Sequence, residues 1–395
     1  MTDPPDQAEA RLRLAFVCAG NPHDLRTWSG TPAHMLQALR PHFDIVDVVS
    51  RPFPAWFLLL RRAVRRLTGG SIDIMWSRFW TSRVSAKTVA MLENSQCDYV
   101  FAVAVTPIAA YLVSVKPTIF LSDATQALMS GYNPHHSRLA PWIKRSAKSL
   151  ESDSIGGAEV CLFPSNWATS SAISHHGGRP EKVITAPWGA NLIADSITQP
   201  EARSASDWRL LFVGTDWFGK GGDIALATVA KMRREGHNVQ IDIVGSVPST
   251  PYPKIDGVTF HGFLDKNLES DRTRLSTLFR AADVFFLPTR FDALGIVVAE
   301  AASYALPAVS YDTGGVSAMV IDQATGLLLK EGADADAFAV ALTGLLEDRD
   351  RYLAMSHAAL ERSRSTLNWA AWGKRVAAEL RARSNPSRKR AANAA

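Results

Sequence analysis

Two acidic residues and one lysine stand where they could bind a ligand that carries hydroxyl and phosphate groups. Glu300 is the only charge in the stretch 296–305, whose composition is otherwise apolar and helical. Such a helix would be buried, and an unpaired carboxylate in it would be costly, so Glu300 needs a hydrogen-bonding partner. Asp292 lies in the loop before this helix. Lys220 precedes another predicted helix, 223–235, where its charge opposes the helix dipole unless both share an anion.

The spacing alone leaves a second interpretation open. Asp292 could cap the helix that follows it, and Glu300 could pair with an internal arginine or lysine. Both interpretations require the same local structure.

That structure begins with a short apolar run, 284–287, which ends at Pro288 as a buried parallel strand would. Ligands of open parallel sheets bind at the carboxyl ends of the strands, which is where Asp292 falls. Gly295 would let the backbone approach a ligand closely, and the first amides of the next helix would face an anion.

Strands and helices alternate in two series along the chain, which predicts an α/β protein with two doubly wound, Rossmann-like domains. The predicted strands are 12–19, 43–49, 99–105, 118–121, 160–164 and 183–186, then 209–214, 239–245, 258–262, 284–287, 308–311 and 326–329. The predicted helices include 31–40, 56–67, 148–157, 165–176, 223–235, 296–305, 334–346 and 369–383.

Composition is that of an ordinary soluble globular protein: 47% of the residues are hydrophobic and 21% charged. A cytoplasmic location is expected from the N-terminal residues and the cysteines. No apolar run is long enough to span a bilayer. Residues 1–10 carry three acids and two prolines, the opposite of a secretory signal, and are expected to be a disordered leader. Three cysteines, Cys18, Cys97 and Cys161, lie far apart and support neither a disulfide framework nor a metal site.

Positive charge gathers in the first half, where residues 51–150 hold thirteen Lys and Arg against four Asp and Glu. Helix 56–67 carries four arginines on one face and apolar residues on another. This pattern suits contact with the inner face of a membrane, and equally suits a helix packed on its own sheet. No stacking motif accompanies the basic residues, so nucleic acid is not an expected partner.

Asp-x-Asp sequences at 334–336 and 348–350 lie at helix edges and are interpreted as caps rather than a metal site. His135, His136, His175 and His176 are placed in loops on a solvated surface.

The chain resembles the retaining GT-B glycosyltransferases of family 4, also called glycosyltransferase group 1. Asp292 and Glu300, with Gly295 between them and Ala305-Leu306-Pro307 after, resemble that family's acidic signature, in which the first acid is usually glutamate. Gly214, Lys220 and Gly221 match the family's Gly-Arg-(four residues)-Lys-Gly spacing. Thr215 replaces the arginine, which removes a charge that Arg290 would have to supply.

The resemblance also assigns roles elsewhere. Gly30 would approach the donor diphosphate, unless it is a plain turn glycine. Asp123, whose preceding histidine is replaced here by Ser122, would orient the acceptor hydroxyl or else cap the next helix. Apart from the resemblance, Phe263 follows Gly262 and is expected to pack in the core, with contact to the nucleotide base as the alternative. A glutamate that is often found near the Gly314-Gly315 turn is Ala318 in this chain.

The function implied is transfer of a hexosyl unit from a nucleotide-diphosphate sugar to a glycan, lipid-linked or small-molecule acceptor, with retained anomeric configuration, as in polysaccharide biosynthesis. No metal and no cofactor beyond the donor substrate is expected. The catalytic candidates are Asp123, Lys220, Asp292 and Glu300. The donor-binding candidates are Gly30, Gly214, Thr215, Lys220, Asp292, Ala293, Leu294, Gly295, Ile296 and Glu300.

The sequence supports two alternatives to this function unequally. An inactive nucleotide-sugar binding protein of the same fold is conceivable because Thr215, Ser122 and Ala318 depart from the family pattern. A serine hydrolase is set aside because the sequence around Ser317 lacks the second glycine of the nucleophile elbow.

A chain of 395 residues exceeds one ordinary core, and the resemblance divides it into domains. The expected segments are a disordered leader (1–10), an acceptor domain (11–192), a linker (193–207), a nucleotide-sugar domain (208–366), a helix crossing back to the first domain (367–384) and a disordered basic tail (385–395).

Overall fold

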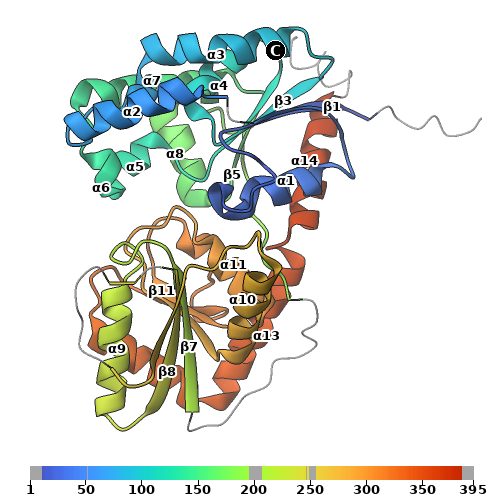
Figure 1. The fold of residues 1–395 in the computed structure, drawn as a ribbon. Coiled ribbons are helices and arrows are strands. Elements are labelled where there is room, and N and C mark those ends of the chain that lie inside the picture. Colours follow the sequence, from blue (N-terminus) through green and yellow to red (C-terminus); the bar gives the residue numbers. More distant parts are fainter. Residues whose placement is uncertain (1–10, 51, 195–206, 246, 249–254, 385–395) are drawn as a thin grey trace, which may run out of the picture.

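The computed structural model describes residues 11–50, 52–194, 207–245, 247–248 and 255–384. Within them the chain forms two lobes, one above the other in Figure 1, and each lobe is built on a six-stranded parallel sheet. The predicted fold class, two doubly wound Rossmann-like domains, is therefore confirmed. The predicted leader and tail, and all of the linker but residues 193–194 and 207, lie outside the described residues.

The first sheet has the order β2-β1-β3-β4-β5-β6. Its strands, in chain order, are β1 (Arg13–Cys18), β2 (Asp44–Ser50), β3 (Tyr99–Val103), β4 (Thr118–Leu121), β5 (Val160–Phe163) and β6 (Val183–Thr185). The helices of this lobe are α1 (Thr31–Leu39), α2 (Ala55–Leu67), α3 (Arg78–Glu93), α4 (Thr106–Leu112), α5 (Gln126–Tyr132), α6 (Pro134–Ser137), α7 (Pro141–Gly157) and α8 (Asn166–His176). Every residue of β3, β4 and β5 is buried, as expected for strands covered on both faces.

The second sheet has the order β12-β11-β10-β7-β8-β9. Its strands are β7 (Asp207–Gly214), β8 (Asn238–Gly245), β9 (Val258–Gly262), β10 (Val284–Leu287), β11 (Ala308–Tyr311) and β12 (Gly326–Leu329). Its helices are α9 (Gly222–Arg234), α10 (Glu269–Ala281), α11 (Ile296–Ser303), α12 (Ala335–Glu347) and α13 (Arg349–Ser365). Strands β7 and β10 are neighbours in the sheet. The chain continues from β7 to β8 on one side and from β10 to β11 on the other, so the strand order reverses between them. In such sheets ligands bind in the crevice between the loops that follow these two strands.

The last helix, α14 (Trp369–Ser384), lies beside the first lobe and packs on α1 (Figure 1). Trp372 is buried and meets Phe101 of β3 edge-on, with ring centroids 6.0 Å apart. Gly373 allows the close approach, since a Cβ there would stand 2.4 Å from the carbonyl oxygen of Ala38. The helix thus joins the end of the chain to its first sheet.

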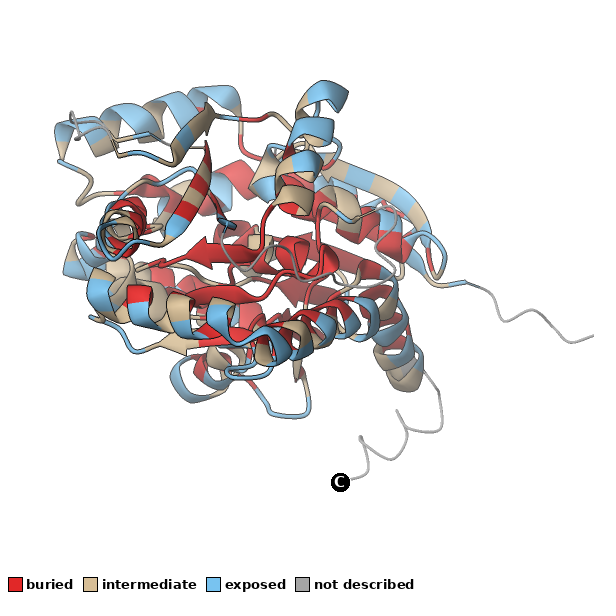
Figure 2. Cartoon of the chain, turned by 90° about the horizontal axis from the view of Figure 1, so that it is seen from below, coloured by how far each residue is buried: buried red, intermediate tan, exposed pale blue. Residues whose placement is uncertain are grey.

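Buried residues concentrate in the strands and on the inner faces of the helices (Figure 2). One cluster follows the second sheet and runs through α14 into one face of the first, and another fills the opposite face of the first sheet. No helix among the described residues is both long enough and apolar enough to cross a bilayer.

Some expectations about individual elements were wrong. Helix α7 begins at Pro141, seven residues before the predicted start, because proline is favoured in a first helical turn. The four histidines lie in helices α6 and α8, not in loops, and His176 is buried. The Asp-x-Asp prediction was correct at both sites: Asp334 and Asp348 accept capping hydrogen bonds at the starts of α12 and α13.

Candidate active site

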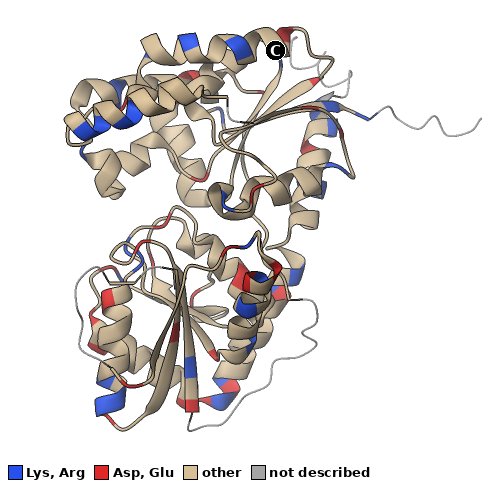
Figure 3. Ribbon diagram, in the orientation of Figure 1, with Lys and Arg blue, Asp and Glu red and all other residues tan. Residues whose placement is uncertain are grey.

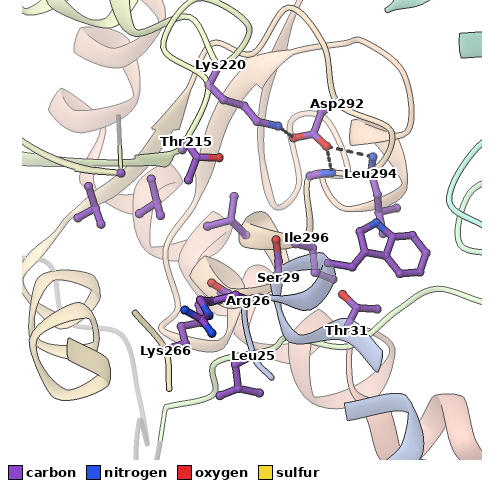
Figure 4. A pocket seen from close by; sticks show the side chains of 18 of the residues that line it. Leu25, Arg26, Ser29, Thr31, Thr215, Lys220, Lys266, Asp292, Leu294 and Ile296 are labelled. Atoms are coloured by element: carbon purple, nitrogen blue, oxygen red, sulfur yellow. Dashed lines mark hydrogen bonds and ion pairs between the residues drawn. The ribbon is translucent and has the colours of Figure 1, made fainter. Parts of the chain in front are cut away.

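A cavity of about 370 Å³ lies between the two lobes (Figure 4). The second lobe lines it with the loops that follow β7 and β10 and with the first turns of α11. The first lobe contributes residues of the loop between β1 and α1, together with Asp123 at the carboxyl end of β4. The cavity therefore occupies the edge at which both sheets present the ends of their strands.

Most of the predicted site residues come together in this cavity. Those that line it are Asp123, Gly214, Thr215, Lys220, Asp292, Leu294, Gly295, Ile296 and Glu300. Ala293 lines a neighbouring cavity instead, and Gly30 lines neither. Lys220 and Glu300, which come from different elements, share one crevice.

Lys220 and Asp292 form an ion pair across the cavity (Figure 4). Lys220 is held immediately before α9 by a bond from its amide to the carbonyl of Asp216, and its side chain runs past Gly214. Only glycine fits there, because a Cβ at position 214 would stand 2.8 Å from the lysine side chain. The lysine ammonium is thereby aimed at the loop before α11.

The other carboxylate oxygen of Asp292 organises the start of α11. Oδ1 accepts hydrogen bonds from the amides of Gly295 at 2.7 Å and Leu294 at 3.2 Å. Gly295 has φ +76°, which suits glycine, and it is the residue from which the helix begins. Asp292 therefore orders the loop before α11, but the predicted capping role was wrong, because the N-cap is Gly295 and no side chain caps the helix.

Tyr132, at the end of α5 in the first lobe, fixes the backbone of Asp292. The amide of Asp292 donates to the Tyr132 hydroxyl at 2.7 Å, and that hydroxyl lies 3.2 Å from the Asp292 carbonyl oxygen. A side chain of one lobe therefore holds the central loop of the other.

Glu300 is 1% exposed and pairs with Lys266. This is the internal partner that the alternative interpretation required, and both residues line the cavity. Sequence reasoning missed Lys266. It stands four residues after the end of β9, so the rule that ligand residues follow the carboxyl ends of parallel strands would have singled it out.

Arg290 does not replace the charge that Thr215 removes. Its guanidinium makes two hydrogen bonds to Asp223, of 2.7 and 2.8 Å, and it does not line the cavity. The additional cations at the cavity are Lys266 and Arg26, which lie near each other in Figure 4. Lys266 is paired with Glu300 and Arg26 with Asp24, so neither supplies a free charge in place of the arginine.

The loop before α1 has an unusual backbone. Trp28 and Ser29 have φ of +46° and +59°, and Gly30 follows with φ +90°. Left-handed conformations in two non-glycine residues are costly and cluster at functional sites. The glycine makes the turn, while its neighbours Ser29 and Thr31 line the cavity. For Gly30, this placement favours the turn role over direct ligand contact.

Asp123 is half-buried and lines the cavity together with Trp28. Burial raises the pKa of Asp123 to about 6, and the nearby charge of Asp292 adds to the rise. The predicted cap of the next helix is instead Thr125, whose hydroxyl accepts from the amide of Leu128. Asp123 therefore remains available to a ligand.

Phe263 is 60% exposed and lines the cavity, so the expectation of core packing for this residue was wrong. The described residues contain no group of three or more His, Cys, Asp or Glu arranged to hold a metal ion.

Comparison with known proteins finds similarity to sugar transferases. Residues 207–348 match the family described as Glycosyl transferases group 1. The D-inositol 3-phosphate glycosyltransferase of Corynebacterium diphtheriae is 25% identical over 274 residues, which is 64% of this chain and 62% of that protein. The same-named protein of Arthrobacter sp. is 23% identical over 301 residues, 73% of this chain and 66% of that protein. Each match thus spans less than two thirds of the relative.

Solved structures show the same fold. Sucrose-phosphate synthase from Thermosynechococcus elongatus superimposes with a TM-score of 0.65 at 16% identity, covering 94% of this chain and 98% of that one. Anabaena HepE in complex with UDP and glucose gives a TM-score of 0.62 at 16% identity, covering 94% and 100%. The protein therefore has the GT-B fold, and its residues 207–348 match the group 1 glycosyltransferase family.

Proposed function

We propose that the protein transfers a hexosyl unit from a nucleotide-diphosphate sugar to a hydroxyl of a glycan, lipid-linked or small-molecule acceptor, with retention of anomeric configuration. The observation that carries this proposal is the convergence of Lys220, Asp292 and Glu300 on one cavity between two lobes. The complex of Anabaena HepE with UDP and glucose supports a nucleotide sugar as the donor class.

In the proposed reaction the bond between the sugar C1 and the β-phosphate oxygen breaks, and a bond from C1 to the acceptor oxygen forms on the same face of the ring. The acceptor proton passes to the departing phosphate oxygen. Lys220 and the amides at the start of α11 stabilise the nucleoside diphosphate as its charge develops. The phosphate would replace Asp292 as the partner of Lys220, leaving Asp292 to hold a sugar hydroxyl.

Asp123 is proposed to orient the acceptor hydroxyl, for which its carboxylate must be ionised. Because its pKa is raised to about 6, kcat/KM for the acceptor should fall as the pH is lowered through about 6. In Asp123→Asn this acidic limb should be absent and the rate low throughout. Rate profiles from pH 5 to 9 test this, with Asp256→Asn, an exposed loop residue, as the control. An unchanged acidic limb in Asp123→Asn would contradict the assignment.

Transfer should not require a metal ion, because Lys220 and the first turn of α11 already line the cavity that would take the diphosphate. We expect the same rate with and without EDTA. A loss of activity in EDTA that Mg²⁺ or Mn²⁺ restores would show that this expectation is wrong.

The proposal as a whole is tested by a calorimetric screen of uridine, guanosine and adenosine diphosphates and their sugars, followed by transfer assays with the donor that binds. Configuration at C1 of the product is read by NMR coupling constants. Binding without transfer or hydrolysis would favour the inactive binding protein, and no binding at all would remove the nucleotide-sugar assignment.

The proposed location is the cytoplasm, with peripheral contact at the inner face of the membrane through α2. Phe57 packs into the core, but Trp56, Leu59 and Leu67 of the same helix are 53%, 63% and 86% exposed. The apolar residues of α2 are therefore not all used by the fold, which supports contact with an apolar surface.

A further inference from the structure

A second cavity, of about 440 Å³, adjoins the candidate active site within the first lobe and shares Trp28 and Asp123 with it. Its lining includes Gln126, which is 4% exposed. The side-chain nitrogen Nε2 of Gln126 has no hydrogen-bond partner among the described residues. Buried polar groups are nearly always paired, so this donor favours a ligand oxygen in the second cavity.

A third cavity, of about 650 Å³, continues from the second and shares Leu58 and Arg61 with it. It lies between α2 and the end of α6, and Figure 3 shows the basic residues along α2. Its arginines are Arg61, Arg62, Arg65, Arg66 and Arg138.

The positive charge of this third cavity is largely uncompensated. Asp73 is the carboxylate that pairs with these arginines. It accepts two hydrogen bonds of 2.7 Å from Arg61, and its Oδ2 lies 3.8 Å from a guanidinium nitrogen of Arg65. In the part of the chain that the structure describes, no ion pair engages the other three arginines of the cavity. Five guanidinium groups thus face one carboxylate.

Two of the arginines in the third cavity are held in place by other residues. Asp73 is 1% exposed, so the salt bridge holds Arg61 in place from below, and Arg65 donates to Nδ1 of His135 at 3.1 Å. Arginine matches the geometry of phosphate oxygens with its planar fork of donors. Asp73 also caps the short helix 74–76 by accepting from the amide of Met75, so its salt bridge ties Arg61 to a fixed part of the backbone.

We propose that the acceptor is a phosphorylated molecule whose reacting hydroxyl lies at Asp123, whose body fills the second cavity and whose phosphate lies among the arginines of the third. This inference rests on the proposed transferase function and specifies its substrate class. The phosphate can belong to a soluble phosphate ester or to a lipid headgroup, and both present the same oxygens to the arginines.

The test uses Arg66→Gln/Arg138→Gln, which leaves Asp73 paired with Arg61 and Arg65 and so avoids an unpaired buried charge. Arg145→Gln/Lys148→Gln on α7 removes the same charge at exposed positions outside the three cavities and is the matched control. Inorganic phosphate binding is measured by calorimetry with the donor site filled by its nucleotide. Transfer is measured to hexoses and polyols, each with and without a phosphate ester, and to lipid-linked sugars in vesicles with and without a phosphate headgroup.

We expect phosphate binding and kcat/KM for phosphorylated acceptors to fall about tenfold for each arginine removed, with the control variant unchanged. If the double arginine variant loses kcat/KM only with soluble phosphate esters, the phosphate belongs to a soluble acceptor. If it loses kcat/KM only with acceptors that carry a phosphate headgroup, the phosphate belongs to a lipid. Equal effects on phosphorylated and unphosphorylated acceptors, or an equal loss of phosphate binding in the control, would overturn the inference. Donor binding and donor hydrolysis are measured in the unaltered protein and in the variants. If the unaltered protein neither binds nor hydrolyses a donor, the transferase proposal has failed. If it does both and the variants show no selective loss with phosphorylated acceptors, only the inference about the acceptor has failed.

Discussion

Lys220→Ala should lower kcat/KM for transfer by about 10³-fold while the protein stays folded. The lysine ammonium is the cation nearest to Asp292, and it precedes a helix whose N-terminus is also positive. Both favour an anion between them, and the charge on the leaving diphosphate increases as the sugar bond breaks. The loss should therefore appear mainly in kcat when the donor is saturating.

The fold should tolerate this change, because Asp292 keeps its hydrogen bonds from the amides of Leu294 and Gly295. Lys231→Ala on the same lobe, whose lysine pairs with Glu235, is the control. Thermal unfolding of both variants should stay close to that of the unaltered protein. Lys220→Arg should recover part of the activity, and transfer at the original rate in Lys220→Ala would remove the residue from the mechanism.

The fold could be predicted to a large extent because its strands are short buried runs with clear ends. The runs at 284–287 and 308–311 appear in the structure with those same bounds. Periodicity was less useful where proline set the boundary, as at Pro141, or where a helix is as short as α6. The physical reason is that a helix start depends on a few capping residues rather than on a repeated pattern.

The site was less predictable, because its ion pairs join residues far apart in the sequence. Asp292 and Lys220 could be proposed from their local settings. Lys266 could not be matched to Glu300, and Arg290 could not be matched to Asp223, because a partner in another loop leaves no local pattern. The left-handed backbone of Trp28 and Ser29 was equally hidden, since neither residue type favours it.

Two sets of hydrogen bonds join the lobes near the residues that line the cavity. Tyr132 holds the Asp292 loop, and Asn267 donates to Asp24 of the first lobe at 3.0 Å while accepting from the amide of Leu25. Lys266, which neutralises Glu300, is adjacent in sequence to Asn267. Variants of the pair can therefore be assayed separately for stability and for donor binding.

Lys266→Met should destabilise the protein by about 3 to 5 kcal/mol, because it leaves the carboxylate of Glu300 buried without its partner. Glu300→Gln should cost less, since the side chain of Lys266 is 18% exposed and can reach water when its partner is gone. Urea unfolding measures both, with Lys330→Met, an exposed lysine, as the control. Equal stability of Lys266→Met and the control would show that the carboxylate is compensated in another way.

Donor binding separates the two interpretations of Glu300. If its carboxylate holds the ribose hydroxyls, Glu300→Gln should raise KM for the donor about tenfold or more, because a charged acceptor is replaced by a neutral amide. If Glu300 only balances Lys266, the same variant should lose stability with an unchanged KM. Lys266→Met sharpens the comparison: a carboxylate released from the lysine should still bind the ribose, so KM should remain near its original value although the fold is weakened. An increase of KM in Lys266→Met with none in Glu300→Gln would assign the donor contact to the lysine instead.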